Sequence, residues 1–128
     1  MQEIYDRAKN IRVAAFDVDG VLTDGTLYFA DSGEELKAFN VRDGHGMKML
    51  KDSGVALAII TSRSSRSLEA RARNLGIDLL FQGAADKLAA ESVEIMERFK
   101  VNQMLVVGPD QKLLGALNMH DLFRAKVI

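Results

Sequence analysis

The sequence predicts an α/β fold built around a doubly wound parallel sheet. The first observation is a set of short apolar runs without polar alternation, typical of strands buried on both faces: Val13–Phe16, Val55–Ile60 and Met104–Val107. The second is a set of helical patterns that alternate with these runs, over Gly46–Ser53, Ser64–Leu75 and Lys87–Phe99. An alternation of strands and helices favours a doubly wound sheet, and we expect Met104–Val107 to lie beside Val13–Phe16.

Two segments interrupt this alternation, and each is predicted to form a β-hairpin. In the first, residues 26–30 and 35–39 flank a polar turn that contains Gly33. In the second, residues 106–107 and 112–117 flank Gly108–Gln111. A short helix from Met119 to about Lys126 follows, with Asn118 as its expected N-cap.

Composition limits the classes of function. With 128 residues, 48% hydrophobic and 27% charged, the chain fits one soluble globular domain. A formal net charge of −1 gives no electrostatic footprint for nucleic acid or for an anionic membrane, so neither is expected as a partner. The absence of cysteine excludes disulfides and thiolate metal sites and suits the cytoplasm. No membrane span or signal peptide is seen in the sequence.

Two aspartates follow the first predicted strand. Ligands of doubly wound sheets bind beyond the carboxyl ends of the strands, where Asp17 and Asp19 are expected. One carboxylate can attack phosphorus while the other handles a proton, and a divalent cation would offset their mutual repulsion. Gly20 allows a sharp turn directly afterwards. On these residues alone, an Asp- and Gly-rich loop without a function remains an alternative.

The surrounding motifs resemble those of the haloacid dehalogenase superfamily and, more narrowly, of its 3-deoxy-D-manno-octulosonate 8-phosphate phosphatases. The resemblance begins at Asp17-Val18-Asp19-Gly20-Val21-Leu22-Thr23-Asp24-Gly25 and extends through the first hairpin. It continues through three further motifs and covers residues 1 to about 90: Asn40–Lys48, Ile59–Ser64 with Asn74–Ile77, and Gly83–Lys87. It implies a Rossmann-like sheet of the haloacid dehalogenase type that has no cap domain.

The resemblance implies a Mg²⁺-dependent phosphatase acting on an acidic eight-carbon sugar phosphate, with the following roles. Asp17 attacks phosphorus and binds Mg²⁺. Asp19 protonates the leaving oxygen and then activates water, and its backbone carbonyl binds the metal. Thr61, Ser62, Arg63 and Lys87 bind phosphate or substrate. Without the family pattern, Thr61 reads as a buried strand-end residue and Lys87 as a solvated surface lysine.

The two histidines carry weaker indications. His45 lies between two glycines at a predicted helix start near the crevice, so a role facing the substrate and a loop position without function are both open. His120 is interpreted as a residue of the first turn of the last helix, because no second histidine or acidic cluster has the spacing of a metal site.

In this family the hairpin at residues 26–39 projects from the domain and pairs with neighbouring subunits in a tetramer, partly covering the active site. The sequence suits a homotetramer, because Leu27, Phe29, Leu36 and Phe39 are too many apolar residues for an isolated ribbon in water. The alternative is a hairpin folded onto its own domain.

The sequence departs from the family's fourth motif. The family has Gly-Asp-Asp after the third strand, whereas this chain has Gly108-Pro109-Asp110-Gln111. Proline cannot bind a metal through its side chain, and Asp110, the candidate third metal residue, stands one place late. Because Mg²⁺ demands near-octahedral oxygen ligands, we expect weaker metal binding.

The last third resembles another family. Glu91–Val107 and Lys112–Ala125 resemble half of a cystathionine β-synthase-type regulatory module, as found in arabinose 5-phosphate isomerases. This suggests a fusion joined shortly after Lys87, with residues 91–128 packed into the same domain. Three hypotheses follow: an active sugar-phosphate phosphatase, a phosphatase scaffold without turnover, and nucleotide binding by the tail.

Overall fold

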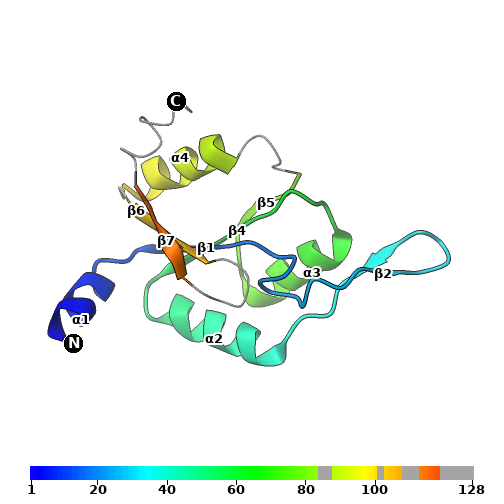
Figure 1. The fold of residues 1–128 in the computed structure, drawn as a ribbon, viewed down its shortest axis with the longest axis horizontal. Helices are drawn as coiled ribbons and strands as arrows, with labels where there is room; N and C mark the ends of the chain where they lie inside the picture. Colours follow the sequence, from blue (N-terminus) through cyan, green and yellow to red (C-terminus); the bar gives the residue numbers. More distant parts are fainter. Residues whose placement is uncertain (84–87, 101–102, 108–112, 119–128) are drawn as a thin grey trace.

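The computed structural model describes residues 1–83, 88–100, 103–107 and 113–118, in which helices lie on both faces of a five-stranded sheet (Figure 1). The strand order is β5-β4-β1-β6-β7, and neighbouring strands are parallel except for the antiparallel pair β6–β7. The predicted α/β sheet is therefore confirmed. The elements of this body are β1 (Val13–Phe16), β4 (Ala56–Ile60), β5 (Leu79–Phe81), β6 (Gln103–Val107), β7 (Leu113–Asn118), α1 (Gln2–Ala8), α2 (Val41–Asp52), α3 (Arg66–Leu75) and α4 (Leu88–Phe99).

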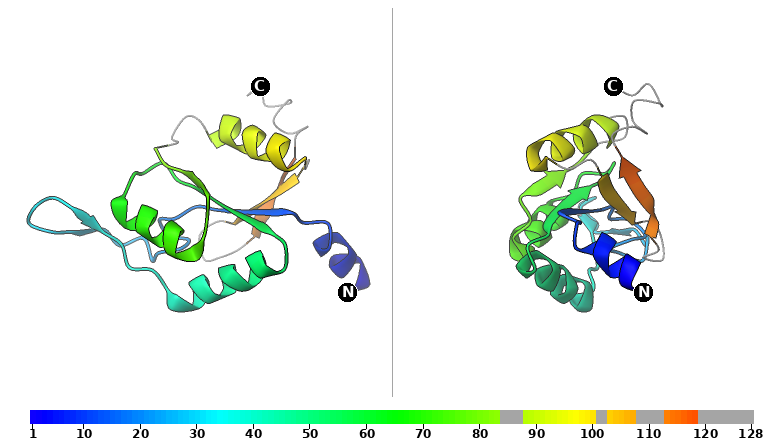
Figure 2. Two further views of the ribbon diagram at one scale, coloured as in Figure 1. Left: turned by 180° about the vertical axis from the view of Figure 1, so that it is seen from behind. Right: turned by 90° about the vertical axis from the view of Figure 1, so that its left-hand side faces the viewer.

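The two faces of the sheet carry separate hydrophobic cores. Successive strand residues point to opposite faces, so Leu57 and Ile59 of β4 pack in one cluster while Ala58 and Ile60 pack in the other. The first cluster includes side chains of α2 and α3, and the second includes Ile95 and Met96 of α4. The layers are seen in Figure 2, with α2 and α3 on one side of the sheet and α4 on the other.

The register brings three strand ends to one edge of the sheet. Phe16, the last residue of β1, pairs with Ile59 of β4 on one side and with Val107 of β6 on the other. The loops that follow these strands therefore begin close together. This confirms that the strand formed by Met104–Val107 lies beside β1.

Both predicted hairpins have antiparallel strands. β2 (Tyr28–Phe29) pairs with β3 (Glu35–Leu36) in a separate two-stranded sheet that projects from the body (Figure 1). Backbone bonds between Ala30 and Glu34, 2.9 Å, and from Gly33 to Ala30, 2.8 Å, close its turn. β6 and β7 form the second antiparallel pair, and the helix expected from Met119 lies outside the described residues.

The structure differs from the sequence prediction at three elements. α2 begins at Val41 rather than Gly46, because Asn40 caps it by accepting a hydrogen bond from Arg42 N at 2.8 Å. A β-carbon at Gly44 would require the side chains of Arg71 and Leu75 of α3 to shift, so the glycine allows close approach of the two helices. α1 and β5 were not predicted.

None of the helices in the described ranges combines the length and apolar character needed to cross a membrane.

Candidate active site at the strand ends

Asp17 and Asp19 flank a buried anchor. Asp17 directly follows β1, and its Oδ1 accepts a hydrogen bond from Val18 N at 2.7 Å. Val18 itself is fully buried in the core, so the two aspartates on either side of it are turned away from the core. Asp17 is exposed and the side chain of Asp19 is 26% exposed. The Asp-x-Asp spacing therefore presents two carboxylates at the end of the central strand.

The loop after Asp19 is held by its own backbone. Val18 O accepts hydrogen bonds from the amides of residues 21, 22 and 23 at 3.1, 2.8 and 3.1 Å. The hydroxyl of Thr23 accepts from Gly20 N at 3.3 Å and from Gly25 N at 3.2 Å. Both glycines have left-handed backbone, with φ of 80° and 84°, which a residue with a β-carbon adopts at a cost. These bonds fix the loop that carries Asp19.

The end of β4 supplies the neighbouring group of predicted site residues. Thr61 directly follows β4, is 4% exposed, and donates its backbone N–H to Phe81 O at 3.0 Å. Its hydroxyl accepts a hydrogen bond from Arg63 N at 3.4 Å. Ser62 and Arg63 are exposed. Since β4 lies beside β1, the structure brings Thr61, Ser62 and Arg63 to the same edge as Asp17 and Asp19.

Four other candidate residues remain from the sequence. Lys87, Asp110 and His120 lie outside the described residues. His45 lies within α2, and its side chain is exposed.

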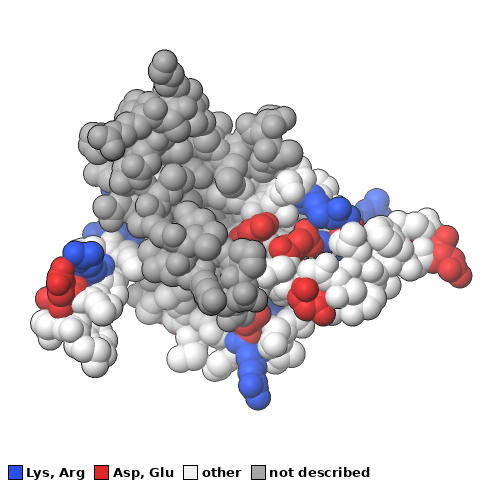
Figure 3. Space-filling view, viewed as in Figure 1, with Lys and Arg blue, Asp and Glu red and all other residues white. Residues whose placement is uncertain are grey.

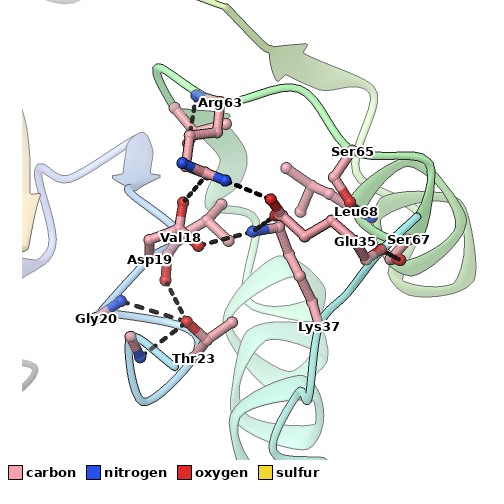
Figure 4. Close-up of polar contacts among 12 residues, drawn as sticks. Val18, Asp19, Gly20, Thr23, Glu35, Lys37, Arg63, Ser65, Ser67 and Leu68 are labelled. Carbon is pink, nitrogen blue, oxygen red and sulfur yellow. Dashed lines mark hydrogen bonds and ion pairs between the residues drawn. The ribbon is translucent and has the colours of Figure 1, made fainter. Parts of the chain in front are cut away.

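Four charged side chains close a ring between the hairpin and the strand ends (Figure 4). Lys37 Nζ lies 2.7 Å from Asp19 Oδ1 and 2.7 Å from Glu35 Oε1. Arg63 donates to Glu35 Oε2, and its Nε lies 3.9 Å from Asp19 Oδ2. The ring alternates in sign. Figure 3 shows acidic and basic side chains side by side where the hairpin leaves the body.

Lys37 is the most buried member of this ring. Its side chain is 3% exposed, against 15% for Glu35 and 42% for Arg63. A buried ammonium requires charged or polar partners, and Asp19 and Glu35 supply them. The Glu35 Oε1 atom is also buried, and its contact with Lys37 is an ion pair without hydrogen-bond geometry.

Sequence reasoning missed Glu35 and Lys37, which it treated only as part of a hairpin strand. The available signal was their spacing, since residues two apart on a strand share a face. On this hairpin that shared face is the one turned toward the aspartates.

The ring shifts the ionisation of its members. The ammonium of Lys37, followed by the guanidinium of Arg63, holds the pKa of Glu35 below its usual value. Burial opposes the charge on Lys37, but the contacts with Asp19 and Glu35 outweigh it and raise the pKa of Lys37. Glu35 likewise raises the pKa of Arg63. All these shifts favour the charged forms.

The described residues supply some, but not all, of the ligands that a hard divalent cation needs. Asp17 offers carboxylate oxygens, and Asp19, whose carboxylate is engaged by Lys37, would offer its backbone carbonyl. Oxygen donors of this kind are what Mg²⁺ prefers. In the part of the chain that the structure describes, no group of three or more His, Cys, Asp or Glu residues is arranged to hold a metal.

Comparison with known proteins shows which proteins the chain is similar to. No family model matches the chain. Among curated proteins, the 3-deoxy-D-manno-octulosonate 8-phosphate phosphatase KdsC of Yersinia pestis is 53% identical over 88 residues, which cover 69% of this chain and 47% of that protein. The chain is a homologue of these phosphatases. The enzyme of the same name from Escherichia coli K12 is 44% identical over 110 residues, covering 84% of this chain and 58% of the relative. The relationship to the phosphatases thus extends beyond the first 90 residues.

Solved structures show the same similarity to these phosphatases. The phosphatase of this name from Moraxella catarrhalis, in complex with a magnesium ion, a phosphate ion and a KDO molecule, matches with a TM-score of 0.76 at 43% identity, over 84% of this chain and 63% of that one. The fold is that of the haloacid dehalogenase superfamily, to which another solved neighbour is assigned. The chain spans about half the length of the curated relatives it matches, 47% to 58%.

The lowered pKa of Glu35 predicts how stability depends on pH. A carboxyl whose pKa is lower in the folded state stabilises the fold above its unfolded pKa, about 4.3 for glutamate, and this contribution is lost as pH falls through the folded pKa. Glu35→Gln should therefore lower the free energy of unfolding at neutral pH, and its difference from the wild type should shrink below about pH 4.3. Urea unfolding from about pH 3 to 7 measures this difference.

Glu34→Gln is the matched control, because Glu34 is exposed on the same hairpin. It should change stability little at any pH. A deficit of Glu35→Gln that stays constant over the whole range would contradict the assigned ionisation.

Proposed function

We propose that the chain is a Mg²⁺-dependent phosphatase that hydrolyses an acidic sugar phosphate, most specifically 3-deoxy-D-manno-octulosonate 8-phosphate. The proposal rests on one observation: two groups of residues lie at the same edge of the sheet. Asp17 and Asp19 follow β1, and Thr61, Ser62 and Arg63 follow the neighbouring strand β4. Homology to phosphatases of this substrate supports it. The binding of magnesium, phosphate and KDO by the Moraxella catarrhalis relative supports the cofactor and the substrate class.

The proposed reaction has two displacements at phosphorus. A carboxylate oxygen of Asp17 forms a bond to phosphorus, and the bond from phosphorus to the bridging sugar oxygen breaks with its electron pair on that oxygen, which takes a proton from Asp19. Water then attacks the aspartyl phosphate while Asp19 takes a proton from it. The products are inorganic phosphate and the regenerated Asp17 carboxylate.

Binding and charge neutralisation fall to the residues around the aspartates. The hydroxyl of Thr61 and the side chain of Ser62 can donate to phosphate oxygens. Arg63 offers a fork of donors suited to a phosphate or sugar carboxylate. Lys87 is proposed to bind phosphate, and Asp110 to complete the metal site with Asp17 and Asp19. A bound Mg²⁺ would supply electrostatic stabilisation of the charge on the transferring phosphoryl group.

A second proposal is a scaffold without turnover. Pro109 stands where the family has a metal-binding acid, and Asp110 stands one place later. If Asp110 does not restore the site, the fold persists and hydrolysis is lost. The fusion with half of a cystathionine β-synthase-type module, with nucleotide binding by that tail, remains a further prediction, as does the cytoplasmic location.

Replacement of the nucleophile tests the first proposal. The wild type should release phosphate from 3-deoxy-D-manno-octulosonate 8-phosphate only when Mg²⁺ is present. Asp17→Asn should lower kcat by roughly 10⁴-fold or more, because amide nitrogen and oxygen cannot replace the attacking carboxylate. Phosphate release is followed colorimetrically. Asp52→Asn, an exposed carboxylate at the end of α2, is the control and should retain activity.

Two outcomes would contradict this proposal. Wild-type phosphate release no greater than that of Asp17→Asn would leave the scaffold without turnover. Nucleotide-dependent thermal stabilisation of an inactive wild type would favour the regulatory tail.

We further propose that the hairpin at residues 26–39 joins copies of the chain in a homotetramer. Its apolar side chains support this, because Leu27, Tyr28, Phe29 and Leu36 are 46%, 46%, 62% and 48% exposed. A two-stranded ribbon with this much exposed apolar area is expected to associate. The projection of the ribbon from the body (Figure 1) supports association between copies over a hairpin folded onto its own domain.

Phe29→Ser combined with Leu36→Ser should reduce the molecular mass measured by sedimentation equilibrium from that of the tetramer to smaller species, because it removes the apolar contact area. Met49→Ser on α2 is the matched control, as Met49 is 61% exposed but lies away from the hairpin. A wild type that is monomeric at all concentrations would refute the tetramer.

A further inference from the structure

The position of Lys37 is unusual for a lysine of a projecting hairpin. It follows β3, yet its side chain is 3% exposed and reaches an aspartate 18 positions earlier in the sequence. Lysines normally keep the ammonium in water, and ordering the long side chain costs conformational entropy. The ion pair between Lys37 and Glu35 lies within the hairpin, whereas the contact with Asp19 joins the hairpin to the loop after β1. The contact with Asp19 therefore calls for its own explanation.

The two carboxylate oxygens of Asp19 have different surroundings. Oδ1 accepts a hydrogen bond from Lys37 Nζ at 2.7 Å. Oδ2 lies 3.9 Å from Arg63 Nε, beyond hydrogen-bonding distance, and no other side chain in the described ranges is recorded as donating to it. Lys37 thus holds one oxygen at hydrogen-bonding distance, whereas the other makes only the longer ion-pair contact with Arg63 (Figure 4).

We propose that Lys37 is the positioning residue of Asp19: by holding Oδ1 it orients Oδ2 toward the leaving oxygen of the substrate. The inference rests on the proposed phosphatase function and adds a residue to it. Lys37 does not touch the reacting atoms. It acts by restricting the rotamer of the aspartate that transfers the proton, and general acid catalysis depends on such placement.

Comparing the loss of Glu35 with the loss of Lys37 distinguishes a positioning role of Lys37 from a purely structural one. It binds Lys37 and Arg63 but does not contact Asp19. If the ring served only to anchor the hairpin, loss of Glu35 and loss of Lys37 would have the same consequences. If Lys37 positions Asp19, the loss of Lys37 alone impairs proton transfer.

The leaving group of the substrate determines whether the rate depends on proton transfer from Asp19. A sugar alkoxide needs a proton to leave, whereas the nitrophenolate released from p-nitrophenyl phosphate leaves without one. The ratio kcat/KM covers only steps up to departure of the alcohol, so the later hydrolysis of the aspartyl phosphate does not enter it. Comparing kcat/KM for the two substrates therefore isolates the acid role of Asp19.

Lys37→Met keeps the length and volume of the side chain and removes the charge. It should lower kcat/KM for 3-deoxy-D-manno-octulosonate 8-phosphate about 100-fold, near the lower end of general acid contributions, and that for p-nitrophenyl phosphate less than about threefold. The loss should appear in kcat with KM little changed. Lys37→Arg, which restores a donor to Oδ1, should recover part of the loss.

The controls are Lys48→Met, an exposed lysine of α2, and Glu35→Gln. Lys48→Met should leave both substrates unaffected, and Glu35→Gln should affect both by the same factor. Circular dichroism and thermal unfolding check that each variant is folded. Equal losses on both substrates for Lys37→Met, or no loss, would overturn the proposal while leaving the phosphatase function intact. A wild type inactive on both substrates would overturn the phosphatase function and, with it, this role of Lys37.

Discussion

The buried ammonium of Lys37, shared between Asp19 and Glu35, is the interaction on which the arrangement of the site depends. It joins the loop after the central strand to a ribbon that projects from the domain. Desolvation of the ammonium is costly, and the ion pairs with the two carboxylates offset this cost. Arg63 closes the ring on the exposed side, so the end of β4 is tied to the same ribbon. One charge cluster thus couples the three segments that carry the chemistry.

The sheet supplies the frame for this cluster. Helices on both faces bury alternate residues of the same strands, which fixes the register of β1 between β4 and β6. That register places the ends of three strands at one edge, and Val18 in the core sets the direction of the aspartates on either side of it. The geometry of the proposed site is therefore a consequence of strand packing. The hairpin then adds the buried ammonium of Lys37 to this site.

The sequence was sufficient for the features that depend on local pattern. Continuous apolar runs predicted β1, β4 and β6, because strands buried on both faces show no alternation, and the motif around Asp17 placed the aspartates correctly. β5 was missed because its apolar run of three residues is too short to distinguish from a loop. The start of α2 was placed at Gly46, whereas the Asn40 cap starts the helix at Val41 and the helix continues through Gly44 and Gly46. Lys37 was missed for a different reason: its spacing from Glu35 indicates a shared face, but it does not indicate that this face meets Asp19, 18 residues earlier in the sequence.

The most direct test of the account is a double-mutant cycle between Asp19 and Lys37. The free energies of unfolding of the wild type, Asp19→Ala, Lys37→Met and the double variant are measured by urea titration at neutral pH. If the ammonium is held by Asp19, the double variant should be more stable than the sum of the single losses predicts, with a coupling of about 1–3 kcal/mol. Losses that add within about 0.5 kcal/mol would show that the two side chains do not interact, and would contradict the account.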